Sequence, residues 1–164
     1  MTRHMTDELA TATLDTPIGA LQLAASPEGL VAVRFPCNEK LPDTRGSAAA
    51  QGHLEQGRTA LQDYFAGRRT VFGELALAPS GTEFQRQVWR ALSLIPFGQT
   101  VSYAHIASRI GRPKAVRAVG LANGRNPLPL IVPCHRVIGS NGSLTGFGGG
   151  LPTKKWLLEF EART

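Results

Sequence analysis

The first half of the chain alternates apolar and polar residues in a pattern that predicts strands. Short apolar runs are separated by turn residues, and the third run ends at Phe35. Residues 36–50 are rich in small, polar and proline residues, so they are expected to form a loop. Apolar residues from Leu54 to Phe65 then follow helical spacing, which Gly67 stops. The expected strands are a first one ending at 14–15, then 21–25, 30–35 and, after the helix, 71–78.

The second half follows helical spacing instead, and a domain boundary is expected at residues 79–81. Thr82 is a suitable helix cap, and Gln85, three residues later, can complete a capping box. This helix is expected to end at residues 96–98. A last helix begins at Pro152 and is expected to bury Trp156, Leu157 and Phe160.

Between these helices, two short ones have the outline of a helix-turn-helix. The first spans residues 103–110 and is closed by Gly111, and the second begins at Pro113 and reaches about Ala122. Such an outline also occurs in proteins that bind no DNA. An apolar strand is expected over residues 128–132. Together the elements predict an α+β fold.

Charge divides the chain at the same point as the pattern. The expected N-terminal α/β domain, residues 1–79, carries seven Lys and Arg against nine Asp and Glu. The expected C-terminal domain, residues 80–164, carries eleven against three. Such an excess of positive charge favours a polyanionic partner, although a solvated basic face explains the charge alone equally well.

The position of the basic residues favours DNA over a solvated face. Residues 103–126 contain no acidic residue, and they hold the second helix of the pair. Small residues on that helix, Ala115, Ala118 and Gly120, would let its backbone lie close to a duplex. The basic residues on the helix and its flanks are Arg109, Arg112, Lys114, Arg117 and Arg125.

Composition limits the cellular setting. No apolar run is long enough to span a membrane, and the first 14 residues lack the apolar segment of an export signal. Cys37 and Cys134 do not make a disulfide framework, so a reducing cytoplasm is expected; a bond between the two is the minor alternative. No metal site is expected, because neither cysteine shows metal-ligand spacing with His4, His53 or His105.

Residues 139–150 are rich in glycine but are not a nucleotide-binding P-loop. They lack the Gly-Lys-Ser/Thr sequence that such a loop requires. Glycine allows backbone to approach a ligand closely, so this segment is interpreted as lying against a flat ligand.

Cys134 is the main candidate for chemistry. It lies in the run Pro133-Cys134-His135-Arg136-Val137, which follows an apolar segment, so the thiol is expected at a tight turn. An ordinary thiol is only a few per cent thiolate at neutral pH, so a nucleophile here needs a proton acceptor and nearby positive charge. His135 is the obvious acceptor, directly or through one water. The hypothesis requires an ionised sulfur that faces a cavity.

A histidine base also needs an acid that fixes its tautomer. The second domain offers Glu83, Glu159 and Glu161. Glu161 shares a helix face with Leu157, so it is expected to point inward, whereas Glu159 is expected to be solvated. The alternatives are a structural buried thiol at Cys134 and a core histidine at position 135, and each residue alone favours its alternative.

The second half closely resembles the O6-alkylguanine-DNA alkyltransferase family. The resemblance is dense over about residues 80–162 and loose over the first half, where it rests on the strand-rich layout and the turn 15–19. Its most specific block is Pro133 to Val137 with Asn126-Pro127 upstream. The other matching segments are 95–98 (IPFG), 102–103 (SY), 111–120 (GRPKAVRAVG), 123–127 (NGRNP), 131–139 (IVPCHRVIG), 144–150 (LTGFGGG) and 155–158 (KWLL).

The resemblance implies a fold and a reaction. The first domain would be ribonuclease-H-like, and the second would be a winged-helix-like domain that binds double-stranded DNA. An alkyl group on O6 of guanine, or on O4 of thymine, would move irreversibly to Cys134 after the base is flipped out. His135 would be the base working through water, and Glu161 would orient it.

Further roles follow from the same resemblance. Asn126 would brace the turn that holds the cysteine. Tyr103 would crowd the target phosphate and donate a proton to the leaving guanine, and Arg117 would enter the base stack. The remaining implied positions are Gln85, Ala104, Arg112 and Ser140 on the DNA backbone, and Val137, Phe147 and Gly148 around the substrate pocket.

One position departs from the family pattern, because Phe147 stands where many members have tyrosine. A phenol hydrogen bond is lost there, so methyl transfer is expected to remain while tolerance of bulky groups stays open. The resemblance implies a monomer, with cooperative DNA binding left open, no cofactor and no membrane partner, and the zinc-binding form of the first domain is not supported. Two other functions stay open: a non-catalytic sensor of alkylated DNA, and a cysteine hydrolase or thiol redox enzyme.

Overall fold

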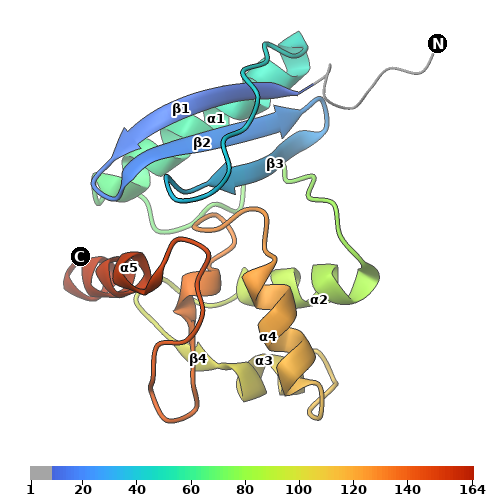
Figure 1. The fold of residues 1–164 in the computed structure, drawn as a ribbon, viewed down its shortest axis with the longest axis vertical. Helices are drawn as coiled ribbons and strands as arrows, with labels where there is room; N and C mark the ends of the chain where they lie inside the picture. Colours follow the sequence, from blue (N-terminus) through green and yellow to red (C-terminus); the bar gives the residue numbers. More distant parts are fainter. Residues whose placement is uncertain (1–8) are drawn as a thin grey trace. The chain divides into compact units, whose positions relative to one another are not determined.

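The computed structural model describes residues 9–164; residues 1–8, which include His4, lie outside the described residues. The chain divides after Ser80 into two compact units (Figure 1). This division falls within the expected boundary at 79–81. Each unit has its own core and is described by itself.

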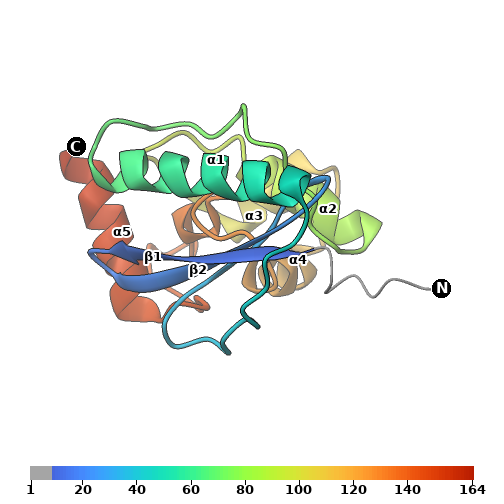
Figure 2. The same ribbon diagram turned by 90° about the horizontal axis from the view of Figure 1, so that it is seen from above.

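The first unit is a three-stranded antiparallel sheet with one long helix on it. The strands pair in the order β1-β2-β3, and the register shifts between Ala24 and Ala25 where β2 meets β3. The helix α1 packs along one face of this sheet (Figure 2) and buries Leu54, Leu61 and Tyr64 against it. The elements are β1 (Ala10–Thr16), β2 (Gly19–Ser26), β3 (Gly29–Arg34) and α1 (Ala48–Phe65).

Two expectations for this unit are wrong. The helix α1 begins at Ala48, inside the expected loop 36–50, because the Ser47 hydroxyl caps it by accepting the backbone N–H of Ala50 at 3.1 Å. Residues 71–78 do not form a strand. The segment makes an isolated bridge, in which Leu77 lies opposite Leu30. The N–H of Leu30 donates to the carbonyl of Ala76 at 2.9 Å, and the N–H of Ala78 donates to the carbonyl of Leu30 at 2.8 Å. At the start of the segment Val71 is 68% exposed, so its side chain makes no apolar packing that would keep this end paired as a strand.

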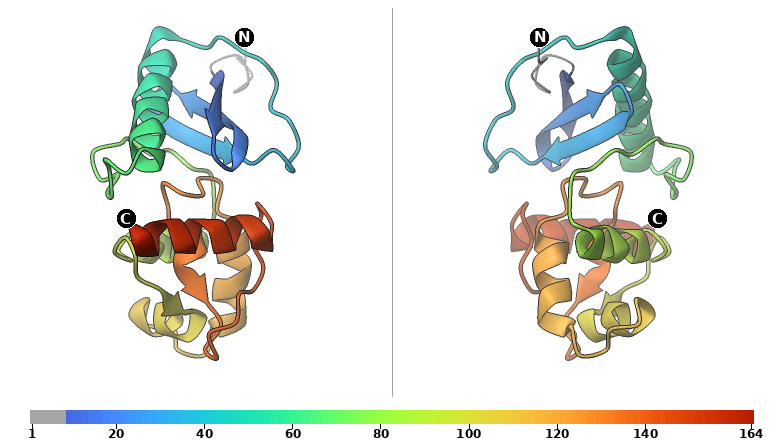
Figure 3. Two further views of the ribbon diagram at one scale, coloured as in Figure 1. Left: turned by 90° about the vertical axis from the view of Figure 1, so that its left-hand side faces the viewer. Right: turned by 90° about the vertical axis from the view of Figure 1, so that its right-hand side faces the viewer.

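The second unit is mainly helical (Figure 3). Its helices α2, α3 and α4 pack together, and a short parallel pair of strands, β4 and β5, joins the start of α3 to the segment after Cys134. The expected capping box at Thr82 is present, with Gln85 accepting the cap N–H in return. The elements are α2 (Glu83–Leu92), β4 (Val101–Ser102), α3 (Tyr103–Arg109), α4 (Val116–Gly124), η2 (Cys134–Arg136), β5 (Val137–Ile138) and α5 (Leu151–Arg163).

Trp89 fastens α2 to α4. Its ring is buried, and its Nε1 donates a hydrogen bond of 2.9 Å to the carbonyl oxygen of Ala122. Val88, Leu92 and Val119 are fully buried around this junction. The second helix of the helix-turn-helix is therefore held by apolar packing and by one buried hydrogen bond.

The helix-turn-helix differs from expectation at its second helix. Helix α4 begins at Val116 rather than Pro113, because the preceding residues close a separate turn in which Ala115 N–H bonds the Arg112 carbonyl at 2.9 Å. Helix α2 also ends earlier than expected, at Leu92 rather than at 96–98.

The apolar run 128–132 is a buried turn and not a strand. The N–H of Val132 bonds the carbonyl of Leu128 at 2.8 Å, and Leu130 has a positive φ of 76°. Helix α5 also buries less than expected. Leu157 is fully buried, whereas Trp156 and Phe160 are partly exposed and stack on each other with ring centroids 5.1 Å apart.

We predict that Trp89→Phe lowers the free energy of unfolding by about 1–3 kcal/mol, because it removes the buried indole donor and leaves the Ala122 carbonyl with the Arg125 N–H at 3.2 Å. Urea denaturation followed by circular dichroism measures the change. Trp156→Phe is the matched control, since that ring is partly exposed, and it is expected to cost less. Equal losses in the two variants would contradict the role given to the Trp89 hydrogen bond.

Candidate active site

The turn η2 places Cys134 in the interior of the second unit. Its N–H bonds the carbonyl of Val132 at 2.8 Å, and the N–H of Arg136 bonds the carbonyl of Pro133 at 3.1 Å. The turn then continues into β5, which pairs with β4 just before Tyr103. Cys134 is 4% exposed. The expected tight turn is therefore present, and it is buried.

Two asparagines from α4 and its end brace this turn. Asn126 donates from Nδ2 to the Val132 carbonyl at 2.8 Å, and its Oδ1 accepts the N–H of Leu128 at 3.0 Å. Asn123, which is buried, donates to the carbonyl of Cys134 itself at 3.5 Å. The amide of Asn126 thus links the two ends of the segment that leads into the cysteine.

Glu161 contacts the side chains of His135 and Arg136, the two residues that follow Cys134 in the turn. Its Oε2 lies 2.7 Å from Nε2 of His135, and the guanidinium of Arg136 donates to both of its oxygens at 2.8 and 3.0 Å. All three side chains are buried. Arg136 also donates to the carbonyl of Ile95 at 2.7 Å. The carboxylate therefore joins α5 to η2 through charge-assisted hydrogen bonds.

This arrangement leaves His135 neutral with one nitrogen able to accept a proton. Burial lowers the pKa of His135 below its usual value, although the neighbouring Glu161 carboxylate acts in the opposite direction. The hydrogen bond to Glu161 assigns the imidazole proton to Nε2. Nδ1 then carries the lone pair, and it is buried without a protein hydrogen-bond partner among the described residues.

Cys134 is a thiol, not a thiolate, in this structure. Burial raises the pKa of Cys134 to about 11, while a hydrogen bond from Asn126 and the charge of Lys154 act to lower it. The expectation of an ionised sulfur is therefore wrong for the protein without DNA. An attack by this sulfur would therefore require a group that takes its proton.

Lys154 is a buried cation whose role the sequence did not suggest. Its Nζ donates to the carbonyl of Val137 at 2.7 Å and to the carbonyl of Thr145 at 2.9 Å. Burial lowers the pKa of Lys154, and the nearby Cys134 acts to raise it. The ammonium thus connects β5, on one side, to the glycine-rich segment on the other.

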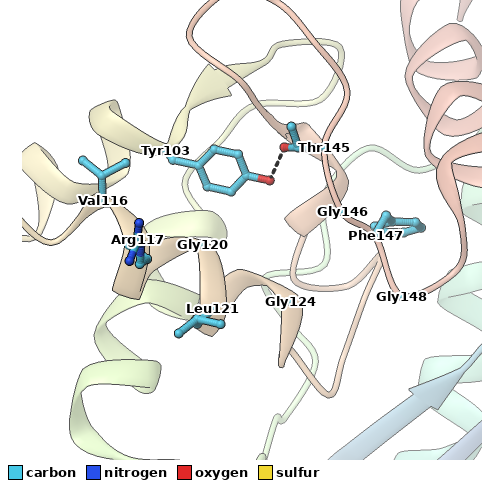
Figure 4. A pocket seen from close by; sticks show the side chains of 10 residues that line it. All are labelled: Tyr103, Val116, Arg117, Gly120, Leu121, Gly124, Thr145, Gly146, Phe147 and Gly148. Atoms are coloured by element: carbon cyan, nitrogen blue, oxygen red, sulfur yellow. Dashed lines mark hydrogen bonds between the residues drawn. The ribbon is translucent and has the colours of Figure 1, made fainter.

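An open hollow of about 580 Å³ lies beside this buried cluster. Its two sides come from different segments, namely α3 with α4, and the glycine-rich segment (Figure 4). The hydroxyl groups of Tyr103 and Thr145 are 2.9 Å apart across it. The lining residues are Tyr103, Val116, Arg117, Gly120, Leu121, Gly124, Thr145, Gly146, Phe147 and Gly148.

The expected site residues fall into three places. His135, Glu161 and Asn126 surround the cysteine turn as described above. Tyr103, Arg117, Phe147 and Gly148 line the hollow, whereas Val137 is buried in β5 and, like Cys134, is not among its lining residues. The four residues expected on the DNA backbone lie on the surface or partly exposed: Gln85, Ala104, Arg112 and Ser140.

Four further residues surround the cysteine turn and the hollow, although the sequence pattern assigned them no role: Arg136, Lys154, Asn123 and Thr145. Arg136 and Lys154 are basic residues in an apolar context, and a fully buried cation requires fixed partners. A basic residue within an apolar stretch of sequence is therefore the pattern that could have indicated a role for Arg136 and Lys154. Nothing in the sequence pattern singled out Thr145, whose partners are distant in the chain.

Comparison with known proteins places the chain in a family. Residues 83–163 match the family described as 6-O-methylguanine DNA methyltransferase, DNA binding domain, and residues 9–79 match its ribonuclease-like domain. A methylated-DNA–protein-cysteine methyltransferase of Methanosarcina acetivorans is 48% identical over 92% of this chain and 96% of its own length. One from Mycolicibacterium paratuberculosis is 50% identical over 92% and 91%.

The chain belongs to the 6-O-methylguanine DNA methyltransferase family. Solved structures agree: the Mycobacterium tuberculosis protein OGT in complex with DNA has a TM-score of 0.84 at 45% identity, covering 94% of this chain and 93% of that one. The O6-methylguanine methyltransferase of the same organism has a TM-score of 0.83 at 44% identity, with the same coverage. The predicted family and the α+β fold with its ribonuclease-like and DNA-binding parts are confirmed.

Other expectations concern metals, disulfides and membranes. Residues 9–164 contain no group of three His, Cys, Asp or Glu side chains that could hold a metal ion. Over the same residues the two cysteines are not bonded to each other, with Cys37 exposed and Cys134 buried. No helix in the described part of the chain is both long and apolar enough to cross a membrane.

We predict that iodoacetamide at pH 8 labels Cys37 and leaves Cys134 almost untouched. With a pKa of about 11 in place of 9.0, Cys134 carries about a hundredfold less thiolate at that pH than an ordinary thiol, and burial slows access further. Peptide mass spectrometry measures both sites, with Cys37→Ser as the single-thiol control. Labelling of the two cysteines at similar rates at pH 8 would contradict the buried-thiol state.

Proposed function

We propose that this protein repairs DNA by taking the alkyl group of O6-alkylguanine, and of O4-alkylthymine, irreversibly onto the sulfur of Cys134. Membership of the family gives the general activity, which is methyl transfer from DNA to a protein cysteine. The observation that supports Cys134 as the acceptor is the buried chain beside it, in which Glu161 holds Nε2 of His135 at 2.7 Å. That contact leaves Nδ1 as a proton acceptor next to the cysteine in sequence.

DNA binds the basic surface that α3, α4 and the turn between them form. Arg109, Arg112, Lys114 and Arg117 are all exposed there, and contacts to phosphates give a large, sequence-independent part of DNA affinity. The O6 atom of guanine is enclosed in a duplex, so the nucleotide must rotate out at a cost of a few kcal/mol. Arg117 lies at the hollow and can occupy the space that the base leaves, which offsets part of that cost.

The transfer moves one alkyl group from oxygen to sulfur. One proton leaves the thiol through His135 to solvent, and another passes from Tyr103 to the purine. The thiol proton of Cys134 passes through one water to Nδ1 of His135, and Glu161 stabilises the resulting imidazolium. The sulfur attacks the alkyl carbon in line, and the bond from that carbon to O6 breaks. Tyr103 gives its hydroxyl proton to the leaving purine and is reprotonated from solvent. The thioether at Cys134 has no good leaving group, so each protein molecule acts once.

Further contacts belong to the same proposal. Gln85, Ala104, Arg112 and Ser140 contact the DNA backbone. Phe147 and Gly148 form the base pocket together with Val137, which is buried in β5 in the protein without DNA. The protein acts as a monomer in the cytoplasm. A non-catalytic sensor is disfavoured because proteins of that class have another residue in place of the acceptor cysteine, whereas Cys134 is present here. A cysteine hydrolase leaves the basic helix with Arg117 unexplained.

Incubation with duplex DNA carrying O6-methylguanine is the main test. The peptide that contains Cys134 should gain the mass of one CH₂, up to one gain per protein molecule, because the thioether is stable. Cys134→Ser should abolish the gain while DNA affinity stays the same. Cys37→Ser is the control and should transfer like the parent, since Cys37 lies in the other unit. Repeated turnover, or transfer by Cys134→Ser, would reject the assignment.

Arg117→Ala should slow repair of duplex DNA by about tenfold or more while changing the reaction with free O6-methylguanine less than about twofold, because only the duplex needs the gap filled. Single-turnover kinetics on both substrates measure the two effects. Arg109→Ala removes an equal charge from α3 without touching the hollow. It should weaken DNA binding only. A similar loss on both substrates with Arg117→Ala would rule out the gap-filling role.

A further inference from the structure

One hydrogen bond joins the two sides of the hollow among the described lining residues. The Tyr103 hydroxyl extends from the first residue of α3, and the Thr145 hydroxyl faces it from the glycine-rich segment at 2.9 Å (Figure 4). Gly146 and Gly148, which follow Thr145, have open space where side chains would stand. These two glycines therefore add no side-chain contacts to this side, and the pair of hydroxyl groups is one of the contacts that position it.

Thr145 contacts the buried ammonium of Lys154 directly, and Tyr103 is connected to the same group through the β4–β5 strand pair. Lys154 Nζ donates to the backbone carbonyl of Thr145 at 2.9 Å, which fixes the residue that carries the hydroxyl. The same Nζ donates to the carbonyl of Val137 at 2.7 Å, and Val137 pairs with Val101, two residues before Tyr103. The backbone that carries the Thr145 hydroxyl is thus fixed directly by Lys154, and the backbone before Tyr103 is linked to it through one strand pair.

The chemistry of the two groups makes this contact more than a structural link. A phenol and an alcohol can each donate one hydrogen bond and accept others. Tyr103 can therefore donate its proton to a purine while its oxygen still accepts a hydrogen bond from Thr145. As the Tyr103 O–H bond breaks and the proton moves to the purine, negative charge develops on the phenol oxygen. A donor already placed at that oxygen stabilises the charge as it forms.

We propose that Thr145 is a positioning residue for the transfer reaction: its hydroxyl holds the Tyr103 hydroxyl at the pocket and donates a hydrogen bond to the phenol oxygen while Tyr103 gives its proton to the leaving guanine. This inference rests on the proposed function, in which Tyr103 is the proton donor. Thr145 needs no contact with the alkyl group or with the sulfur. The effect proposed here passes through Tyr103, and a double-mutant cycle isolates it.

Single-turnover methyl transfer from duplex DNA tests the proposal with a double-mutant cycle. Thr145→Val removes the hydroxyl and keeps the shape, so the rate constant at saturating DNA should fall about two- to tenfold, the fold-change expected for one lost hydrogen bond. Thr145→Ser should restore the rate to within about twofold of the parent. Once Tyr103→Phe has removed the phenol oxygen, adding Thr145→Val should cause no further loss.

The matched control is Ser143→Ala. It removes a hydroxyl from the same glycine-rich segment, but that hydroxyl bonds Asn141 at 2.7 Å and not Tyr103. Its transfer rate should equal that of the parent. Thermal unfolding midpoints and DNA affinity are measured for every variant, and Thr145→Ala replaces Thr145→Val if the latter unfolds. A purely structural role would lower the midpoint and would not be rescued selectively by serine.

Three results would overturn the proposal: a parent-like rate for Thr145→Val, no rescue by Thr145→Ser, or a loss that multiplies with that of Tyr103→Phe. In each of these cases the parent still transfers the methyl group, and the proposed function stands. Absence of transfer by the parent protein overturns the proposed function, and this inference with it. The two failures are therefore distinguishable in one set of measurements.

Discussion

The second unit depends on a buried carboxylate that must be neutralised. Glu161 is almost fully enclosed, and an isolated charge in that position would be costly. Arg136 donates to both of its oxygens, His135 lies 2.7 Å from Oε2, and the N–H of Gly98 donates to Oε1 at 3.3 Å. Replacing a buried ion pair by apolar residues is often neutral or stabilising, so stability alone does not explain the pair. Its chemical consequence does: the paired carboxylate fixes the imidazole proton on Nε2 and leaves Nδ1 as the acceptor.

The same burial separates a resting state from a reactive one. Because the pKa of Cys134 is raised to about 11, the sulfur is a thiol at neutral pH and is protected from other electrophiles. Asn126 and Lys154 partly oppose the effect of burial, so the thiolate is disfavoured but within reach once a base takes its proton. For a protein that is consumed by one reaction, a low thiolate fraction in the absence of substrate limits side reactions of the sulfur.

Short-range sequence patterns predict those features of the structure that depend on contacts within one helix. The capping box at Thr82 was found because both partners lie within one helical turn. The inward direction of Glu161 followed from its spacing to Leu157 on the same helix. The apolar run 128–132 predicts a strand, and this prediction is wrong because an apolar run does not reveal that Asn126 bonds to both ends of a turn. Lys154 and Thr145 could not be paired from sequence for the same reason, since their contact spans two segments.

The proposed reaction places opposite demands on the two proton carriers assigned to it, His135 and Tyr103, and these two side chains lie in different surroundings. The acceptor, His135, must remain neutral and oriented before DNA arrives, and a buried contact of 2.7 Å to Glu161 does not depend on solvent or on DNA. The donor, Tyr103, must meet a base that enters from outside, so its hydroxyl has to lie where the pocket opens. There, water competes with every hydrogen bond, and orientation is harder to maintain. A hydroxyl partner on the facing segment, anchored by a buried ammonium, provides that orientation at an exposed position.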